Sequence, residues 1–222
     1  MSEKKMIYLQ PTPVRIWHWL NAFGIVTLCV TGVQIRFPEY VNLFASYKSA
    51  ILLHNTAGLV VALSFSFWFF YYAFMVKTMA KLYIPNTDDL QFGLFQQAKF
   101  YLLTYFLGGD NPHRPKPEDK FNPMQKSAYL AIMFVLMPLV NLSGIVLINI
   151  SPLRELILVV GGLKILVGIH FILACFLCSF LITHIYMATL GHTFFAHFKQ
   201  MWTGWEEELE GAPERGQETR SA

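Results

Sequence analysis

Four long stretches of the chain carry no formal charge, and they limit the possible folds more than any other feature of the sequence. They cover residues 16–35, 51–76, 127–150 and 165–189. An α-helix needs roughly 20 apolar residues to cross a bilayer, and each stretch reaches that length. Only 14% of the 222 residues are charged, against about 25% in an average soluble domain. The sequence therefore predicts an integral membrane protein.

The predicted fold is an all-α membrane bundle of four helices. Helices are expected because they satisfy their own backbone hydrogen bonds inside lipid, and Pro138 in the third span is tolerable where neighbouring groups replace its lost bond. Residues 91–107 are rich in Phe, Tyr and Leu with one Lys, which favours a helix lying at the cytoplasmic membrane surface between spans two and three. We expect one membrane domain over residues 1–205 and a polar cytoplasmic tail over 206–222.

The distribution of Lys and Arg predicts the orientation of the four spans. Residues 1–15 lack the apolar core and the small-residue cleavage site of a signal peptide, so we expect the amino terminus to be retained. With that terminus inside, thirteen of the seventeen Lys and Arg residues fall on the inner side. Cytoplasmic loops carry such an excess. Both termini are therefore expected in the cytoplasm, with the chain in a bacterial inner membrane.

Four of the seven histidines lie inside the predicted spans: His18, His54, His170 and His184. Ionisable groups are costly within a bilayer and usually mark a functional site. His170 and His184 are fourteen residues apart on one span, which leaves them about 40° apart around the helix and about 21 Å apart along it. These two side chains therefore face the same way at two different depths.

The direction of each span pairs the four histidines by depth. His18 and His184 fall near the cytoplasmic surface, whereas His54 and His170 fall in the outer leaflet. An apolar ligand that takes one imidazole on each face, and occurs at two depths, is haem b. Iron held by histidine on both sides has no open position, so such a site suits electron transfer. The sequence therefore predicts two haems b, with these four histidines as the axial ligands of the iron.

Several residues near these positions allow more than one interpretation. Glycine could let a haem approach a helix backbone, or it could let two helices pack closely, and this choice stays open for Gly24, Gly58 and Gly168. His113, His192 and His197 lie outside the spans and are expected to be ordinary interfacial or solvated side chains.

Three alternatives to the haem interpretation also arise from the sequence. A zinc site made from His170, Cys175, Cys178 and His184 is disfavoured, because ligands spread over about 21 Å cannot share one ion with bonds of about 2 Å. The cysteines are expected to behave as small apolar residues. A transporter that relays protons through its histidines would be colourless, and so would a haem-free membrane anchor. We expect no nucleic-acid partner.

Several motifs resemble the di-haem cytochrome b subunits of membrane-bound nickel-iron hydrogenases, formate dehydrogenases and thiosulfate reductases. The first span opens with Arg-Ile-Trp-His-Trp at residues 15–19, and His54 is followed by Gly58 in the second. The sequence Phe-Asn-Pro-Met-Gln-Lys at residues 121–126 precedes the third span, and His170 and His184 lie in the fourth. These features cover nearly the whole membrane part of the chain.

The resemblance implies a function and a set of partners. In that family the inner haem is held by the residues matching His18 and His184, and the outer haem by those matching His54 and His170. A quinone, either menaquinone or ubiquinone, binds beside the inner haem near Asn122 and His184. Pro123 and Met124 replace the Ala-Gly pair that is usual in formate dehydrogenases.

The family's role is electron transfer across the membrane and not catalysis by residues of this chain alone. Electrons pass between the quinone pool and an iron-sulfur or catalytic subunit on the outer face, of the hydrogenase or formate dehydrogenase type. Flow in the opposite direction, from quinol to a thiosulfate or polysulfide reductase, is the alternative.

Overall fold

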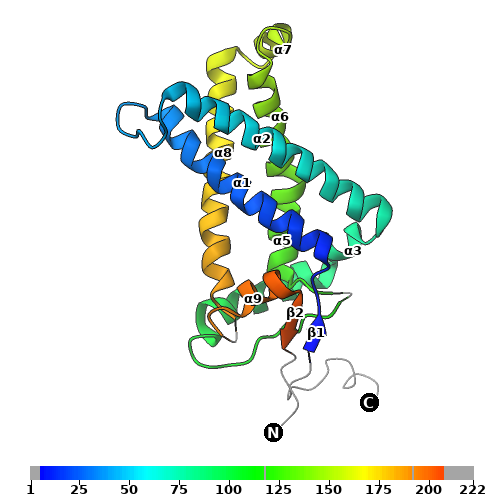
Figure 1. Cartoon of the computed structure of the whole chain (residues 1–222). Helices are drawn as coiled ribbons and strands as arrows, with labels where there is room; N and C mark the ends of the chain where they lie inside the picture. Colours follow the sequence, from blue (N-terminus) through cyan, green and yellow to red (C-terminus); the bar gives the residue numbers. More distant parts are fainter. Residues whose placement is uncertain (1–5, 118, 192, 208–222) are drawn as a thin grey trace, which may run out of the picture.

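The computed structural model describes residues 6–117, 119–191 and 193–207 and is mostly helical (Figure 1). Five-residue π-helical turns, labelled η, interrupt several of the α-helices. The elements in chain order are β1 (Met6–Tyr8), α1 (Thr12–Arg36), α2 (Tyr47–Phe70), η1 (Tyr71–Met75), α3 (Met79–Tyr83), η2 (Asp89–Gly93), α4 (Leu94–Lys99), η3 (Phe100–Thr104), α5 (Pro123–Ala131), η4 (Ile132–Leu136), α6 (Met137–Ile148), α7 (Arg154–Val159), α8 (Leu163–Ala188), α9 (Ala196–Thr203) and β2 (Trp205–Glu207).

Four helical rods are long and apolar enough to cross a membrane, which confirms the predicted bundle. They are Thr12–Arg36, Tyr47–Met75, Pro123–Ile148 and Leu163–Ala188. Each begins a few residues before the predicted span, because the first turn is built from polar or proline-containing sequence. Ser46 accepts a hydrogen bond from the Ser49 amide at the start of α2, for example, and so caps one of the amides that a helix start leaves unpaired.

The third span contains a π-helical turn directly before its proline. Pro138 lies in the first turn of α6, and η4 occupies the five residues before α6. A proline inside a helix removes one backbone hydrogen bond and crowds the carbonyl four residues earlier, and here that carbonyl belongs to Phe134. The wider π-helical turn gives this carbonyl room, so the rod continues to Ile148.

The spanning helices form two packed pairs. In Figure 1 α1 and α2 run side by side and cross the pair formed by α6 and α8. Gly24 allows the close approach of α1 to α2, because a Cβ atom at this position would lie 2.5 Å from Cγ2 of Val61. A Cβ on Gly58 would meet only Leu28, at 3.7 Å. The structure therefore supports the helix-packing interpretation for Gly24 and Gly58. At Gly168, an added Cβ would have no atom within 4 Å.

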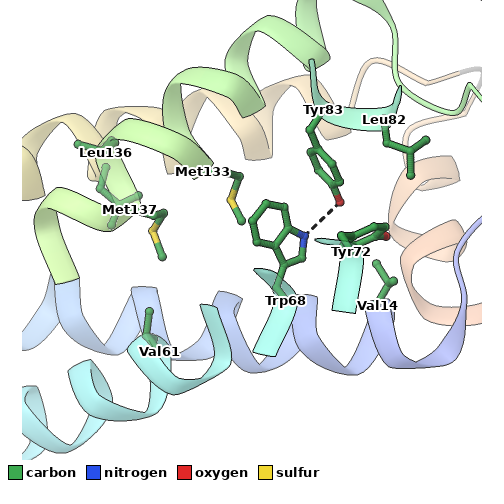
Figure 2. Packing of buried hydrophobic residues seen from close by; sticks show 10 residues of the cluster. Val14, Val61, Trp68, Tyr72, Leu82, Tyr83, Met133, Leu136 and Met137 are labelled. Atoms are coloured by element: carbon green, nitrogen blue, oxygen red, sulfur yellow. Dashed lines mark hydrogen bonds between the residues drawn. The ribbon is translucent and has the colours of Figure 1, made fainter. Parts of the chain in front are cut away.

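An aromatic cluster fixes the end of the bundle at which α2 finishes (Figure 2). Trp68 is 2% exposed, and its indole N–H donates a hydrogen bond of 3.2 Å to the hydroxyl of Tyr83 from α3. Tyr72 lies on the same side of the indole, and Met133 of the third span closes the other side. Aromatic rings bury large areas, and their polar tips need a partner once buried. The cluster thereby ties α3 to two spanning helices.

Both ends of the described chain lie at this end of the bundle. Strand β1 pairs with β2 in an antiparallel ladder, with Ile7 opposite Glu206. This small sheet was not part of the all-α prediction, and it includes Glu206 and Glu207, which the sequence analysis assigned to the tail. Residues 208–222, the rest of that tail, lie outside the described part of the chain.

The long connection between the second and third spans contains the helix predicted from its composition. η2, α4 and η3 form one continuous helical segment from Asp89 to Thr104, close to the predicted 91–107. We call this segment the connecting helix. It packs against α5, and its position at a membrane surface stays a prediction. The connection between the third and fourth spans contains the short helix α7.

Candidate functional site

The structure brings His18 and His184 together at the end of the bundle that carries the termini. His18 lies in the second turn of α1 and His184 in the last two turns of α8. Their ring centroids are 6.1 Å apart, with the rings inclined by 51°. We call these residues the inner pair.

His54 and His170 meet at the other level of the bundle. His54 lies near the start of α2, and His170 lies two turns into α8. Their ring centroids are 6.4 Å apart, and the rings are inclined by 77°. We call these residues the outer pair. The two pairs are those that the helix directions predicted.

The spacing within each pair suits a metal ion held between two imidazoles. Metal–imidazole bonds are about 2 Å long, so a bound ion lies about 3 Å from each ring centroid and the two centroids lie about 6 Å apart. Both observed distances are close to this value. Among the described residues, no group of three or more His, Cys, Asp or Glu side chains is placed to bind a metal. Two histidines per site match the donor set of a haem iron, whose other ligands are porphyrin nitrogens.

Hydroxyl groups from neighbouring helices orient both rings of the outer pair. Thr31 Oγ1 lies 2.8 Å from His54 Nδ1 and donates its own proton to the Thr27 carbonyl. Ser143 Oγ lies 2.8 Å from His170 Nδ1 and donates to the Val140 carbonyl. Each hydroxyl therefore accepts a bond from an Nδ1–H, which leaves Nε2 unprotonated. This is the arrangement that metal-binding histidines adopt, because the second ring nitrogen is fixed by a hydrogen bond.

Two glycines next to these hydroxyls make room for the outer rings. A Cβ atom on Gly32 would lie 3.5 Å from Cε1 of His54, and one on Gly144 would lie 3.3 Å from Cε1 of His170. The sequence analysis considered other glycines and missed this pair. The available signal was a hydroxyl residue followed by glycine, Thr31-Gly32 and Ser143-Gly144, in two different spans.

The inner pair has different surroundings. His18 Nδ1 is buried and has no hydrogen-bond partner among the described residues. His18 packs edge-on against Trp19, and His184 stacks on Phe180 at 5.7 Å. His197 of α9 lies close enough to His184 to interact with it electrostatically. The prediction that His197 is an ordinary interfacial side chain is therefore too simple, whereas His192 lies outside the described residues.

A cavity of about 260 Å³ opens next to the end of α8 that carries His184. It lies between the connecting helix, the start of α5 and the last turns of α8, and the two lining residues with a polar group in their side chain are Tyr101 and Tyr186. We call it the Tyr101 cavity. Its lining residues are Ala98, Tyr101, Leu102, Phe106, Met124, Tyr186, Met187 and Leu190.

Asn122 lies behind this cavity and not in its lining. Its Oδ1 accepts a hydrogen bond from the Gln125 amide, and the Gln125 side chain accepts one from the Asn122 amide, which forms a capping box at the start of α5. The Asn122 Nδ2 group donates to the Tyr101 hydroxyl at 3.2 Å. Any effect of Asn122 on a ligand in the cavity therefore acts through Tyr101.

Cys175 and Cys178 lie about one turn apart on α8 and have different surroundings. Cys178 Sγ lies 2.8 Å from Sγ of Cys29 on α1, and Cys175 is exposed. Cys178 thus contributes to the contact between α1 and α8.

Membrane-length helices that hold two facing histidine pairs at two depths define the architecture of a membrane-embedded cytochrome of the b type. Comparison with known families gives the same result. Residues 9–204 match the prokaryotic cytochrome b561 family, and the chain belongs to that family. It is therefore a membrane b-type cytochrome, and the family implies b-type haem.

Individual relatives connect this family with respiratory enzymes. The chain is 29% identical over 201 residues to the cytochrome YdhU of Escherichia coli K12, covering 90% of this chain and 74% of the relative. It is 36% identical over 92 residues to a protein of Rhizobium leguminosarum bv. viciae named as a Ni/Fe-hydrogenase B-type cytochrome subunit, 37% of each chain. It is 25% identical over 122 residues to the formate dehydrogenase cytochrome b556(fdo) subunit of E. coli K12, 48% of this chain and 58% of the relative. The aligned parts span less than two thirds of these last two relatives.

Proposed function

We propose that the chain carries electrons across a bacterial inner membrane between a partner subunit on the outer face and quinone at the inner face. The observation that carries this proposal is the pair of facing-histidine sites on α8, with centroid distances of 6.1 and 6.4 Å, fourteen residues or about 21 Å apart along one helix. When bound, two haems b supply two one-electron carriers at these levels.

The four histidines have the role of axial ligands in this proposal. His54 and His170 hold the outer haem, and His18 and His184 hold the inner one. The Thr31 and Ser143 hydroxyls support this assignment. They bind the Nδ1 atoms of His54 and His170, which leaves the Nε2 atoms of both rings free to bind iron. Membership of a cytochrome family counts against the haem-free transporter and the haem-free anchor.

The orientation in the proposal comes from charge. The end of the bundle with the inner pair carries strands β1 and β2 and the long connection (Figure 1). The sequence up to the first span, the long connection and the sequence after the fourth span hold most of the Lys and Arg residues. Cytoplasmic segments have this excess, so the inner pair faces the cytoplasm and both termini are inside. Relatives named as hydrogenase and formate dehydrogenase subunits favour an iron-sulfur or catalytic partner at the opposite face.

The Tyr101 cavity is the binding site that we propose for quinone. It lies next to the last turns of α8, two and three residues beyond His184, and its lining is apolar apart from two tyrosines. Quinone rings are flat and apolar with two carbonyl acceptors, and the Tyr101 and Tyr186 hydroxyls are donors that suit them. Reduction to quinol consumes two electrons and two protons, and oxidation of quinol releases them.

A cavity-filling substitution tests this function. We expect the purified chain to show a b-type reduced-minus-oxidised spectrum and to be oxidised rapidly by a short-chain quinone. Met124→Trp should keep the spectrum and abolish the rapid oxidation, because the indole occupies the quinone cavity. Met75→Trp, at a side chain that is 72% exposed, is the matched control and should behave as the wild type. A colourless wild-type protein, or unchanged oxidation of the Met124→Trp variant, would overturn the proposal.

A further inference from the structure

A group of charged side chains lies where the connecting helix meets the start of α5. Lys126 Nζ lies 2.8 Å from Asp119 Oδ1 and 3.1 Å from Asp89 Oδ2. The Asp119 side chain is 51% exposed, whereas those of Asp89 and Lys126 are 13% and 7% exposed. Asp119 therefore contacts solvent, and the other two groups extend inward from it.

His113 lies close to this group and bonds through its ring to the Asp119 backbone. Its ring is close enough to Asp119, Lys126 and Asp89 to interact with all three. The Nε2 atom of His113 is buried, and the described residues offer it no hydrogen-bond partner. The backbone amide of His113 donates to Asn111 Oδ1 at 3.0 Å.

Asn111 connects His113 to the connecting helix. The same Asn111 Oδ1 atom accepts a bond of 3.1 Å from Nε2 of Gln97, a side chain that is fully buried. The Oε1 atom of Gln97 is a second buried polar atom without a partner in the described part of the chain. The Gln97 side chain also interacts with the hydroxyl of Tyr101. Tyr101 lies four residues, about one helical turn, after Gln97 in the connecting helix. Tyr101 lines the cavity proposed for quinone.

These contacts form an almost continuous polar connection from the surface to the cavity. A network with a purely structural role would be expected to pair its buried polar atoms, since an unpaired one is destabilising. Here His113 Nε2 and Gln97 Oε1 are both unpaired, and both residues bond to one atom of Asn111. Both atoms can accept a hydrogen bond from a bridging water, which needs two or more polar partners.

The protonation states of His113 and Tyr101 suit proton transfer. Burial lowers the pKa of His113 from its ordinary value, so near pH 7 the imidazole is neutral and can accept a proton. Burial raises the pKa of Tyr101, so its hydroxyl stays protonated and can pass one proton on while it accepts another. Among the described residues, the remaining lining of the cavity includes no carboxylate, lysine or histidine.

We propose that Asp119, His113 and Tyr101 form a path that carries protons between the inner surface and the quinone cavity, with Asn111 and Gln97 positioning the bridging water. This inference rests on the proposed quinone function. The inner haem, when bound, would supply the two electrons of quinone reduction, and Tyr101 would pass on the two protons that the reaction consumes. In quinol oxidation the same two protons leave in the opposite direction.

The test removes His113 from the full-length, haem-loaded protein. We expect His113→Ala to slow haem oxidation by a short-chain quinone by at least about tenfold, since a positioned acid or base typically contributes 10²–10⁴-fold. Haem content and the affinity for a non-reactive quinone analogue should not change, and added imidazole should restore the rate. Asp119→Asn, which keeps the side-chain shape, should also slow the reaction, whereas Arg114→Ala in the same loop should not.

The possible outcomes separate the path from the function on which it rests. A normal rate in His113→Ala would overturn the path while leaving the quinone function intact. A slow rate that imidazole does not restore, or that comes with weaker binding of the analogue, would show a structural role for His113 and would also overturn the path. A wild-type protein that exchanges no electrons with quinone would overturn the proposed function itself.

Discussion

The outer and inner histidine pairs have almost the same spacing but different surroundings. In the outer pair, both rings are held by hydroxyls from other helices, and small residues lie against them. In the inner pair, His18 Nδ1 has no such partner among the described residues, and a cavity lies next to the end of α8 that carries His184. The difference fits the two tasks that we propose: electron transfer in one fixed geometry at the outer site, and exchange of a substrate and its protons at the inner site.

The largest expected effect on the difference between the two pairs comes from removing the hydroxyl groups that orient the outer pair. Thr31→Val and Ser143→Ala each delete the acceptor that orients His54 or His170. We expect haem affinity at the outer site to fall about 10–100-fold, the usual effect of losing the group that orients a metal-binding histidine. Transfer of haem to an excess of apo-globin measures this loss. Thr27→Val, at an exposed hydroxyl that bonds only its own helix, is the control, and a fall of equal size there would contradict the assigned role.

A smaller effect is expected for the pairing of strands β1 and β2 at the inner end of the bundle. Burial raises the pKa of Glu206 to about 7, so the folded chain favours the protonated carboxyl. The stabilisation from this protonation is complete below the ordinary pKa of about 4.5 and is lost as the pH rises through about 7. The pairing of β1 with β2 should therefore weaken as the pH rises from about 4.5 to about 7.

Hydrogen exchange at the Ile7 amide, opposite Glu206 in the register, measures this weakening. After correction for intrinsic exchange, protection should fall over that pH range in the wild type and stay constant in Glu206→Gln. Equal pH dependence in both proteins would show that Glu206 does not control the strand pair. Outer-end amides, for example those early in α8, should not respond.

The sequence predicted the histidine pairs because depth depends only on helix direction and on position along each span. His170 and His184 share a helix, so their separation was fixed, and His18 and His54 could then match only one level each. The partners Thr31 and Ser143 could not be predicted in the same way. Their spans are apolar on all sides, so no amphipathic pattern shows which face of α1 or α6 turns toward the histidines.

The cavity and the polar connection were beyond prediction for a different reason. Tyr101, Met124 and Tyr186 come from three separate segments, and only the folded connection brings them together. The sequence indicated a helix near residues 91–107 but gave no information on how it packs against α5. His113 therefore read as an ordinary loop residue, although the structure buries its Nε2 atom beside Asp119.

A haem count on single-histidine variants tests the central assignment most directly. Wild-type protein should contain two haems b per chain. His54→Ala and His170→Ala should each retain one haem, with the same midpoint potential. His18→Ala and His184→Ala should retain the other haem, with its own potential. Two haems in any of these variants, or a shared residual haem between His54→Ala and His18→Ala, would contradict the pairing across the bundle.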